Sequence, residues 1–358
     1  MFIQNKIKEI MSFKIELACL KSTLVLSLLL LCLPGKSQYN FSGVDELLTK
    51  NQKAFGNDLA VVLYKDGKII YQKSLGEFTI KTAAPVAGAS KWLTAALVMT
   101  FVAEGKLSLD EKISTYIPIF ETYSKGYITL RQCLSNQTGI ADNKGLGKQL
   151  DHKKFESLEE EVNSYAKKEI ADNAGKTFFY GNIGVNIAAR VVEIVAKKNF
   201  ETLMKQRIFT PLLMRHTSFS GDADLIDPAS GAVSTAEDYI NFLTMILDKG
   251  MFMGKQVLTA KALEEMETIQ NKDVPVKYTP KITEGFGYGL GTWIQEVDAK
   301  GNSMVVGCPG LFGTWPFVDK CRGYACIIFI KKLIPEQKKE FFVKIKETID
   351  EQIKPACN

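Results

Sequence analysis

Residues 85–92 read PVAGASKW and stand where an apolar helix is expected to begin. A lysine can activate a serine three residues before it, because positions i and i+3 share one helix face and the amine can take the hydroxyl proton. At the helix N-terminus, backbone N–H groups and the helix dipole would stabilise an oxyanion. Lys91 fits the place of this lysine, but Gly88 stands three residues earlier. The stretch is typical of acyl-transfer chemistry with its nucleophile missing.

Other nucleophiles and bases nearby fit less well. Ser90 is one residue from Lys91, so the two side chains point to different helix faces, and we interpret Ser90 as an N-cap or a small packing residue. His152 lies in a charged stretch and His216 in an expected loop, and no G-x-S-x-G motif is present. A histidine-based hydrolase and a histidine-rich metal site are therefore both disfavoured.

The elements that must position Lys91 come from both ends of the chain. Residues 59–76 predict a β-hairpin with Asp66-Gly67 at its turn. The helix that follows is apolar on nearly every side, which indicates burial, and Gly105 marks its end. The middle of the chain, to about residue 282, is mostly helical, with the clearest helices over 184–199 and 235–250.

The pattern changes to strands after residue 287. Short β-rich runs occupy 287–297, 303–310, 312–320 and 324–332, and residues 336–353 close the chain as an amphipathic helix. The arrangement predicts an α+β fold, with a sheet built from both ends of the chain and a helical insertion between them.

These stretches resemble the serine β-lactamase and penicillin-binding-protein-like family, on its class C and esterase side. The similarity runs from about residue 59 to 330, and the segments that carry it are 88–118, 128–140, 177–195, 210–219, 229–247, 285–293 and 308–314. The resemblance implies the β-lactamase/transpeptidase-like fold, an antiparallel sheet flanked by N- and C-terminal helices plus a mostly helical subdomain. The expected sheet subdomain spans about 39–87 and 283–358, and the helical subdomain about 88–282.

The resemblance also implies a role for each site residue. Lys91 is the amine beside the nucleophile position, Tyr180 is a phenolate-type base or proton shuttle, and Asn182 would bond both Lys91 and a substrate carbonyl. The alternatives are an exposed or ion-paired lysine at a helix start, a core tyrosine and a turn residue. The N–H groups of Gly88 and Leu311 would form the oxyanion hole.

Three positions depart from the family pattern. Gly88 stands where the nucleophilic serine is expected, and Asn136 replaces a histidine. The third motif, Cys308-Pro309-Gly310, begins with cysteine instead of lysine or histidine. Cys308 could be a nucleophile if its pKa were lowered, or a buried small hydrophobe.

The charge distribution and the N-terminal segment restrict the expected partners and the expected location of the protein. The net charge of +5 is diffuse, and no basic block is interleaved with aromatic residues, so nucleic acid is not an expected partner. Residues 1–38 have the basic start, short apolar run and polar exit of a signal peptide, with an N-terminal anchor as the alternative. We expect a protein of residues 39–358 in the periplasm or outside the cell, with no membrane span.

Five cysteines remain after residue 38, which leaves at least one free thiol or an intermolecular bridge. Cys321 and Cys326 flank an expected turn and are candidates for pairing. No metal or organic cofactor is implied.

Two functions therefore stay open. The first is a serine hydrolase of this family, an esterase, peptidase or β-lactam-reacting enzyme, impaired by Gly88. The second is a non-catalytic relative that binds small-molecule or peptide-like acyl ligands in the retained cleft.

Overall fold

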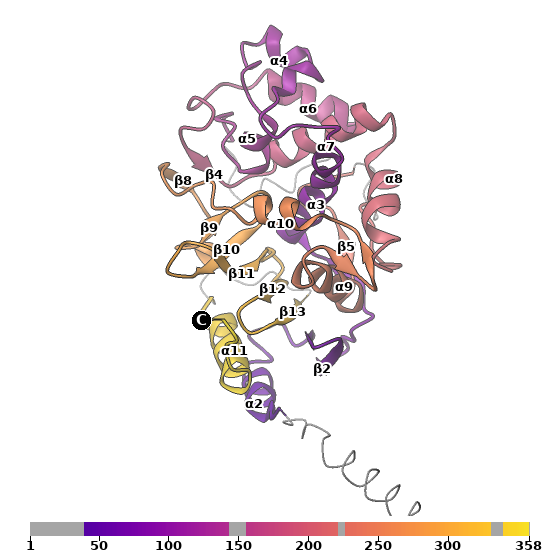
Figure 1. Cartoon of the computed structure of the whole chain (residues 1–358), viewed down its shortest axis with the longest axis vertical. Coiled ribbons are helices and arrows are strands. Elements are labelled where there is room, and N and C mark those ends of the chain that lie inside the picture. Colours follow the sequence, from indigo (N-terminus) through magenta and orange to yellow (C-terminus); the bar gives the residue numbers. More distant parts are fainter. Residues whose placement is uncertain (1–38, 143–154, 221–225, 331–338, 358) are drawn as a thin grey trace, which may run out of the picture. The chain divides into compact units, whose positions relative to one another are not determined.

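The computed structural model describes residues 39–142, 155–220, 226–330 and 339–357 (Figure 1). The predicted signal peptide and His152 lie outside the described residues. Residues Phe41–Asn358 form one unit. Among the described residues, no helix is long and apolar enough to cross a membrane.

A seven-stranded antiparallel sheet, in the order β2-β1-β13-β12-β11-β10-β9, is the main framework of this unit. It joins strands from the two ends of the chain, as the sequence predicted. Its strands are β1 (Leu59–Lys65), β2 (Lys68–Leu75), β9 (Gly287–Tyr288), β10 (Trp293–Val297), β11 (Ser303–Gly307), β12 (Trp315–Asp319) and β13 (Tyr324–Ile330).

The first hairpin forms where its turn residues require it. Asp66 and Gly67 have φ values of 49° and 79°, and a two-residue hairpin turn needs positive φ at both positions. β1 then pairs with β13 on its other edge, so its backbone is paired on both sides. The predicted hairpin is confirmed.

The helices gather mainly at one end of the sheet, where Figure 1 shows α4 to α7 together. Their bounds are α2 (Ser42–Lys50), α3 (Ser90–Ala103), α4 (Ile119–Thr122), α5 (Leu130–Leu134), α6 (Leu158–Ala166), α7 (Ile183–Ala196), α8 (Phe200–Met204), α9 (Ala236–Leu247), α10 (Ala260–Met266) and α11 (Lys339–Gln352). Short strands connect them: β3 (Ala84–Pro85), β4 (Phe178–Phe179), β5 (Val233–Ser234), β6 (Met251–Phe252), β7 (Lys255–Gln256) and β8 (Val276–Tyr278).

α3 is the buried helix that the sequence predicted. Its residues from Ser90 to Phe101 are all buried, so its packing does not depend on one apolar stripe. It ends just before Gly105, whose φ of 68° is the left-handed conformation that terminates helices. Because α3 is fixed along its length, Lys91 in its first turn is held firmly.

Helices cover both faces of the sheet. α9 begins after Thr235, whose side chain accepts a hydrogen bond from the Asp238 N–H, and it packs against β1, β12 and β13. Alternate residues of β12 face the other way, where the Trp315 ring stacks on Phe342 of α11 at 4.5 Å. α11 also contacts α2, beside which it lies in Figure 1.

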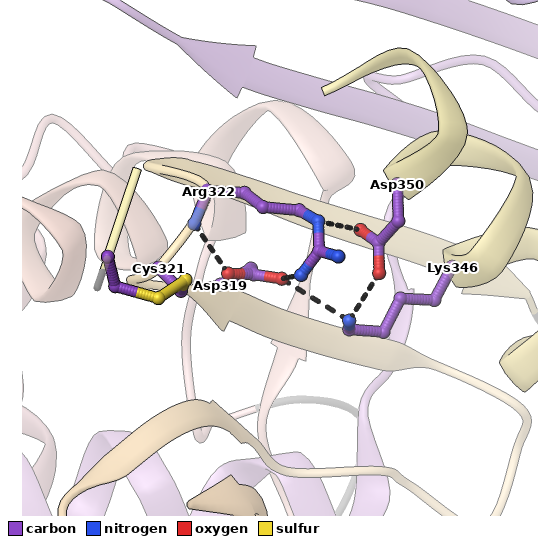
Figure 2. The surroundings of a disulfide bond; sticks show 6 residues. Asp319, Cys321, Arg322, Lys346 and Asp350 are labelled. Carbon is purple, nitrogen blue, oxygen red and sulfur yellow. Dashed lines mark hydrogen bonds and ion pairs between the residues drawn. A yellow bond between two sulfur atoms is a disulfide. The ribbon is translucent and has the colours of Figure 1, made fainter. Parts of the chain in front are cut away.

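The predicted pairing of Cys321 with Cys326 is wrong. Cys321 is bonded to Cys357, and the chain end is also held by the Ala356 N–H, which donates to the Cys321 carbonyl at 2.8 Å (Figure 2). Cys326 is a buried free thiol within β13, paired in register with Phe317. Cys321 lies in the turn between β12 and β13, outside their paired residues. The segment after α11 comes back to this turn, where Cys357 bonds to Cys321.

Candidate active site

Lys91, Tyr180 and Asn182 meet at the N-terminal end of α3. The Lys91 side chain is 1% exposed, and its Nζ donates to Asn182 Oδ1 at 2.8 Å and to the Ala229 carbonyl at 3.2 Å. The same Nζ lies 4.8 Å from the centre of the Tyr180 ring. The contact between Lys91 and Asn182 implied by the family resemblance is present, between residues 91 positions apart.

Burial tunes the Lys91 amine. Loss of solvent lowers its pKa to about 8, and the charges of Asp227 and Asp142 offset only part of this effect. Its two hydrogen-bond acceptors are a neutral amide and a carbonyl. The amine can therefore gain and lose a proton near neutral pH, which suits a general base.

Tyr180 is held in an aromatic cluster. Its ring packs against Trp293 and Tyr288 with centroid distances of 5.1 Å and 5.8 Å. Burial raises the pKa of Tyr180 well above its usual value. The phenol therefore stays protonated at neutral pH. It suits a hydrogen-bond donor, whereas Lys91 is the better base.

Gly88 faces the Tyr180 hydroxyl directly. A Cβ built on Gly88 would lie 2.8 Å from Tyr180 Oη and 3.2 Å from the Pro309 carbonyl oxygen. A contact below 3.0 Å requires a shift, so the phenol occupies space that a serine would need. The preceding residue, Ala87, has a φ of 46°, a conformation that alanine rarely adopts and that is found at functional sites.

Asn182 has a second partner that the sequence reasoning missed. Its Nδ2 donates to Ser230 Oγ at 3.2 Å, and the Ser230 hydroxyl in turn donates to Asp227. Asp227 also contributes to the field at Lys91. Ser230 lies in the segment of family similarity over 229–247 and Asp227 lies just before it, but nothing in the local pattern singled them out as neighbours of Lys91.

Cys308 is buried behind Gly88. Its Sγ lies 3.2 Å from the Gly88 carbonyl oxygen and 3.7 Å from that of Gly291. Burial raises the pKa of the thiol to about 12, and the charge of Lys91 opposes this only in part. A neutral thiol that donates to backbone carbonyls fits a packing role better than a nucleophilic one.

Ser90 is fully buried and takes no part in the cluster. Its Oγ accepts a hydrogen bond from the Ala232 N–H at 3.0 Å, so it joins α3 to the segment before α9. The N-cap position of α3 is Ala89, without a side-chain hydrogen bond. Of the two roles expected for Ser90, the packing role is the one observed.

The third-motif loop packs against the segment before Gly88. A Cβ on Gly310 would lie 2.3 Å from the Val86 carbonyl oxygen, so only glycine fits there. The Gly310 N–H donates to the Thr314 carbonyl at 2.7 Å, which closes the loop. Among the described residues, the Leu311 N–H has no hydrogen-bond acceptor. An oxyanion hole formed by the N–H groups of Gly88 and Leu311 stays a prediction.

Asn136 anchors the loop that carries Tyr180. Its Oδ1 accepts from the Gly181 N–H at 3.1 Å, and its carbonyl accepts from the Phe179 N–H at 3.0 Å.

The other histidine named above, His216, lies 3.7 Å from Asp238 with a side chain that is 61% exposed. Within the described ranges, no group of three or more His, Cys, Asp or Glu side chains is placed to hold a metal ion.

Two cavities flank the strand pair β4 and β8. The first, of about 240 Å³, includes Asn136, Asp142 and Gly181 in its wall. The second, of about 670 Å³, includes Phe178, Phe286 and Trp293. Lys277 lines both cavities.

The chain is similar in sequence to known proteins. The chain is 24% identical over 272 residues to a teichoic acid D-alanine hydrolase from Staphylococcus aureus. The aligned region covers 72% of this chain and 66% of the relative. The chain therefore spans just under two thirds of the length of this curated relative.

Solved structures agree on the fold. A candidate beta-lactamase from Bacteroides dorei DSM 17855 superposes with a TM-score of 0.78 and 25% identity, over 87% of this chain and 99% of that one. An octameric penicillin-binding protein homologue from Pyrococcus abyssi has a TM-score of 0.71 and 18% identity, over 88% and 79%. A sequence model of the Beta-lactamase family matches residues 51–342. Because this match spans most of the chain, the protein belongs to the beta-lactamase family.

Proposed function

We propose that this chain binds small acyl ligands, such as esters, amides or peptide-like molecules, at Lys91, Tyr180 and Asn182, and that its hydrolysis of them is strongly impaired. The observation that carries this proposal is Gly88, which faces the Tyr180 hydroxyl without a side chain. Removing a nucleophile that acts as part of a unit lowers the rate by up to about 10⁶-fold.

The surrounding cluster supports ligand binding. Lys91 keeps a pKa of about 8, and its amine and the Asn182 amide are held together by a hydrogen bond. Ala87, which precedes Gly88, has the strained backbone with positive φ that is found at functional sites. The similarity to a teichoic acid D-alanine hydrolase adds ligands that carry D-alanine to the proposed class.

A second candidate function is binding with no turnover at all. The position of Tyr180 favours it, because the phenol oxygen lies within 2.8 Å of where a Cβ of residue 88 would stand. A water molecule that replaced the serine hydroxyl would compete with the phenol for this space. The two candidates differ in whether any hydrolysis of bound ligand remains.

We also propose export to the periplasm or outside the cell. The disulfide between Cys321 and Cys357 supports this, since such bonds persist in oxidising compartments. Mass analysis of the protein recovered from cell fractions would test both the location and the removal of residues 1–38.

The direct test compares the native chain with Gly88→Ser and Gly88→Ala in the hydrolysis of a p-nitrophenyl ester and a chromogenic cephalosporin. We expect turnover only in Gly88→Ser, at least about 100-fold above the other two, because only serine restores the nucleophile. Gly88→Ala is the matched control, since it adds the Cβ without the hydroxyl.

Two results would contradict the proposal. Native turnover equal to that of Gly88→Ser would show that residue 88 is not the nucleophile position. A Gly88→Ser variant as inactive as Gly88→Ala would show that the cluster around Lys91 does not support acyl transfer.

A further inference from the structure

The smaller cavity adjoins the loop that carries two residues of the candidate site. Gly181 lies in its wall, between Tyr180 and Asn182 in the chain. The Asp142 carboxylate stands over this glycine, because a Cβ on Gly181 would lie 3.0 Å from Asp142 Oδ2. Asp142 also contributes to the electric field at the Lys91 amine. The cavity and the cluster are therefore neighbouring parts of one region.

The charges of the cavity wall leave one carboxylate unpaired. Asp172 accepts a hydrogen bond from Thr177 Oγ1 at 3.1 Å and lies 4.0 Å from the Lys277 amine. Asp142 has neither a hydrogen-bond partner nor an ion-pair partner among the described residues. Since Lys277 is matched by Asp172, the cavity has a net negative charge at Asp142.

We infer that this cavity binds the ammonium group of the acyl ligand, with Asp142 as its counter-ion. The ligand class is thus an α-aminoacyl ester or amide, whose ammonium and carbonyl groups are one carbon apart. A carboxylate that accepts from an ammonium group forms a charge-assisted hydrogen bond, which is stronger than a neutral one. This inference rests on the proposed function, because the proposed function places the acyl carbon of the ligand at the cluster around Lys91.

The test measures binding of two probes to the native full chain by calorimetry at pH 7. D-alaninamide carries the ammonium group, and N-acetyl-D-alaninamide has the same skeleton without the charge. We expect the native chain to bind D-alaninamide at least about tenfold more tightly. Asp142→Asn, which keeps the shape of the side chain, should abolish this preference and leave the affinity for the acetylated probe unchanged. Asp273→Asn, an exposed carboxylate outside the cavity, is the control and should behave as the native chain does.

The outcomes separate this inference from the proposed function. If the native chain binds both probes equally and Asp142→Asn changes neither affinity, ammonium recognition is wrong and acyl-ligand binding stands. If the native chain binds neither probe, both the inference and the proposed binding of small acyl ligands are wrong. If Asp273→Asn loses the preference as well, the effect is one of net charge, and Asp142 is not the counter-ion.

Discussion

Lys91 and Lys346 are both largely withdrawn from solvent, but their surroundings shift their pKa values in opposite directions. At the C-terminal end, Lys346 of α11 contacts Asp319 at 3.2 Å and Asp350 at 2.7 Å (Figure 2). It also contacts Glu296 at 3.0 Å. Burial by itself would lower the pKa of Lys346, but these carboxylates together raise it. Lys91 meets only a neutral amide and a carbonyl, and its pKa falls to about 8.

The difference is the one expected between a structural site and a candidate functional site. In the C-terminal network, Arg322 contacts Asp319 and Asp350 as well, so each buried charge has an opposite partner and the group ties α11 to the sheet. Around Lys91 the protein accepts a buried amine without a direct counter-ion. Such a pKa shift without structural compensation is typical of functional sites.

The largest expected effect lies in the C-terminal region. Replacing Cys321 and Cys357 together by serine should lower the free energy of unfolding by about 4 kcal/mol, because the bond closes a loop whose ends are 36 residues apart. Urea unfolding would measure this loss. Binding of acyl ligands at Lys91 should not change, and treatment of the native chain with a reductant should give the same loss of stability. A double variant as stable as the native chain would contradict this account of the region.

The pH dependence of stability should distinguish the two lysines. The pKa of Lys91 is about 8 in the folded chain and near 10.5 in the unfolded chain, so between these values only the unfolded chain binds the proton. The free energy of unfolding, relative to Lys91→Met, should therefore rise by up to about 3 kcal/mol from pH 7 to pH 10.5. Urea titrations at several pH values would show it.

Lys346→Met is the matched control for this experiment. Because the folded-state pKa of Lys346 is raised, its stabilising effect is fully present up to about pH 10 and is lost only as the pH rises further. The difference between the native chain and Lys346→Met should thus stay constant between pH 7 and pH 10. A flat profile for Lys91→Met as well would show that the two regions do not differ.

The smallest expected effect concerns the space between Gly88 and Tyr180. Gly88→Ala should destabilise the native chain by about 1 kcal/mol, because its Cβ would lie 2.8 Å from Tyr180 Oη. In a Tyr180→Phe background the same change should cost less, because only the 3.2 Å contact with the Pro309 carbonyl oxygen remains. Urea unfolding of the four chains gives the coupling energy directly. Equal costs in both backgrounds would mean that the phenol does not occupy this space.

Much of this framework follows from local sequence patterns. Asp66-Gly67 predicted the hairpin, the apolar run after Lys91 predicted a buried helix, and the periodicity over 235–250 predicted α9, because turns, burial and helical periodicity depend on nearby residues. The resemblance to the family brought together Lys91, Tyr180 and Asn182, which no local rule could have joined.

The rest depends on tertiary contacts without a local signal. The disulfide partner of Cys321 is set by the path of α11, and Cys326 was the nearer but wrong choice. Ser230 and Asp142 reach the candidate site through the folding of separate loops. The short distance between the Tyr180 hydroxyl and Gly88 is a property of the folded chain. The composition of the sequence and the spacing of its motifs do not encode it.

The most direct test of the central claim, that this is an acyl-transfer site without its nucleophile, is the intact mass of the protein after brief reaction with p-nitrophenyl butyrate. The account predicts no stable adduct on the native chain and one butyryl group on Gly88→Ser, which peptide mapping places at residue 88. An adduct on the native chain at Ser90, Ser230 or Cys308 would contradict it, because the protein would then hold a working nucleophile elsewhere.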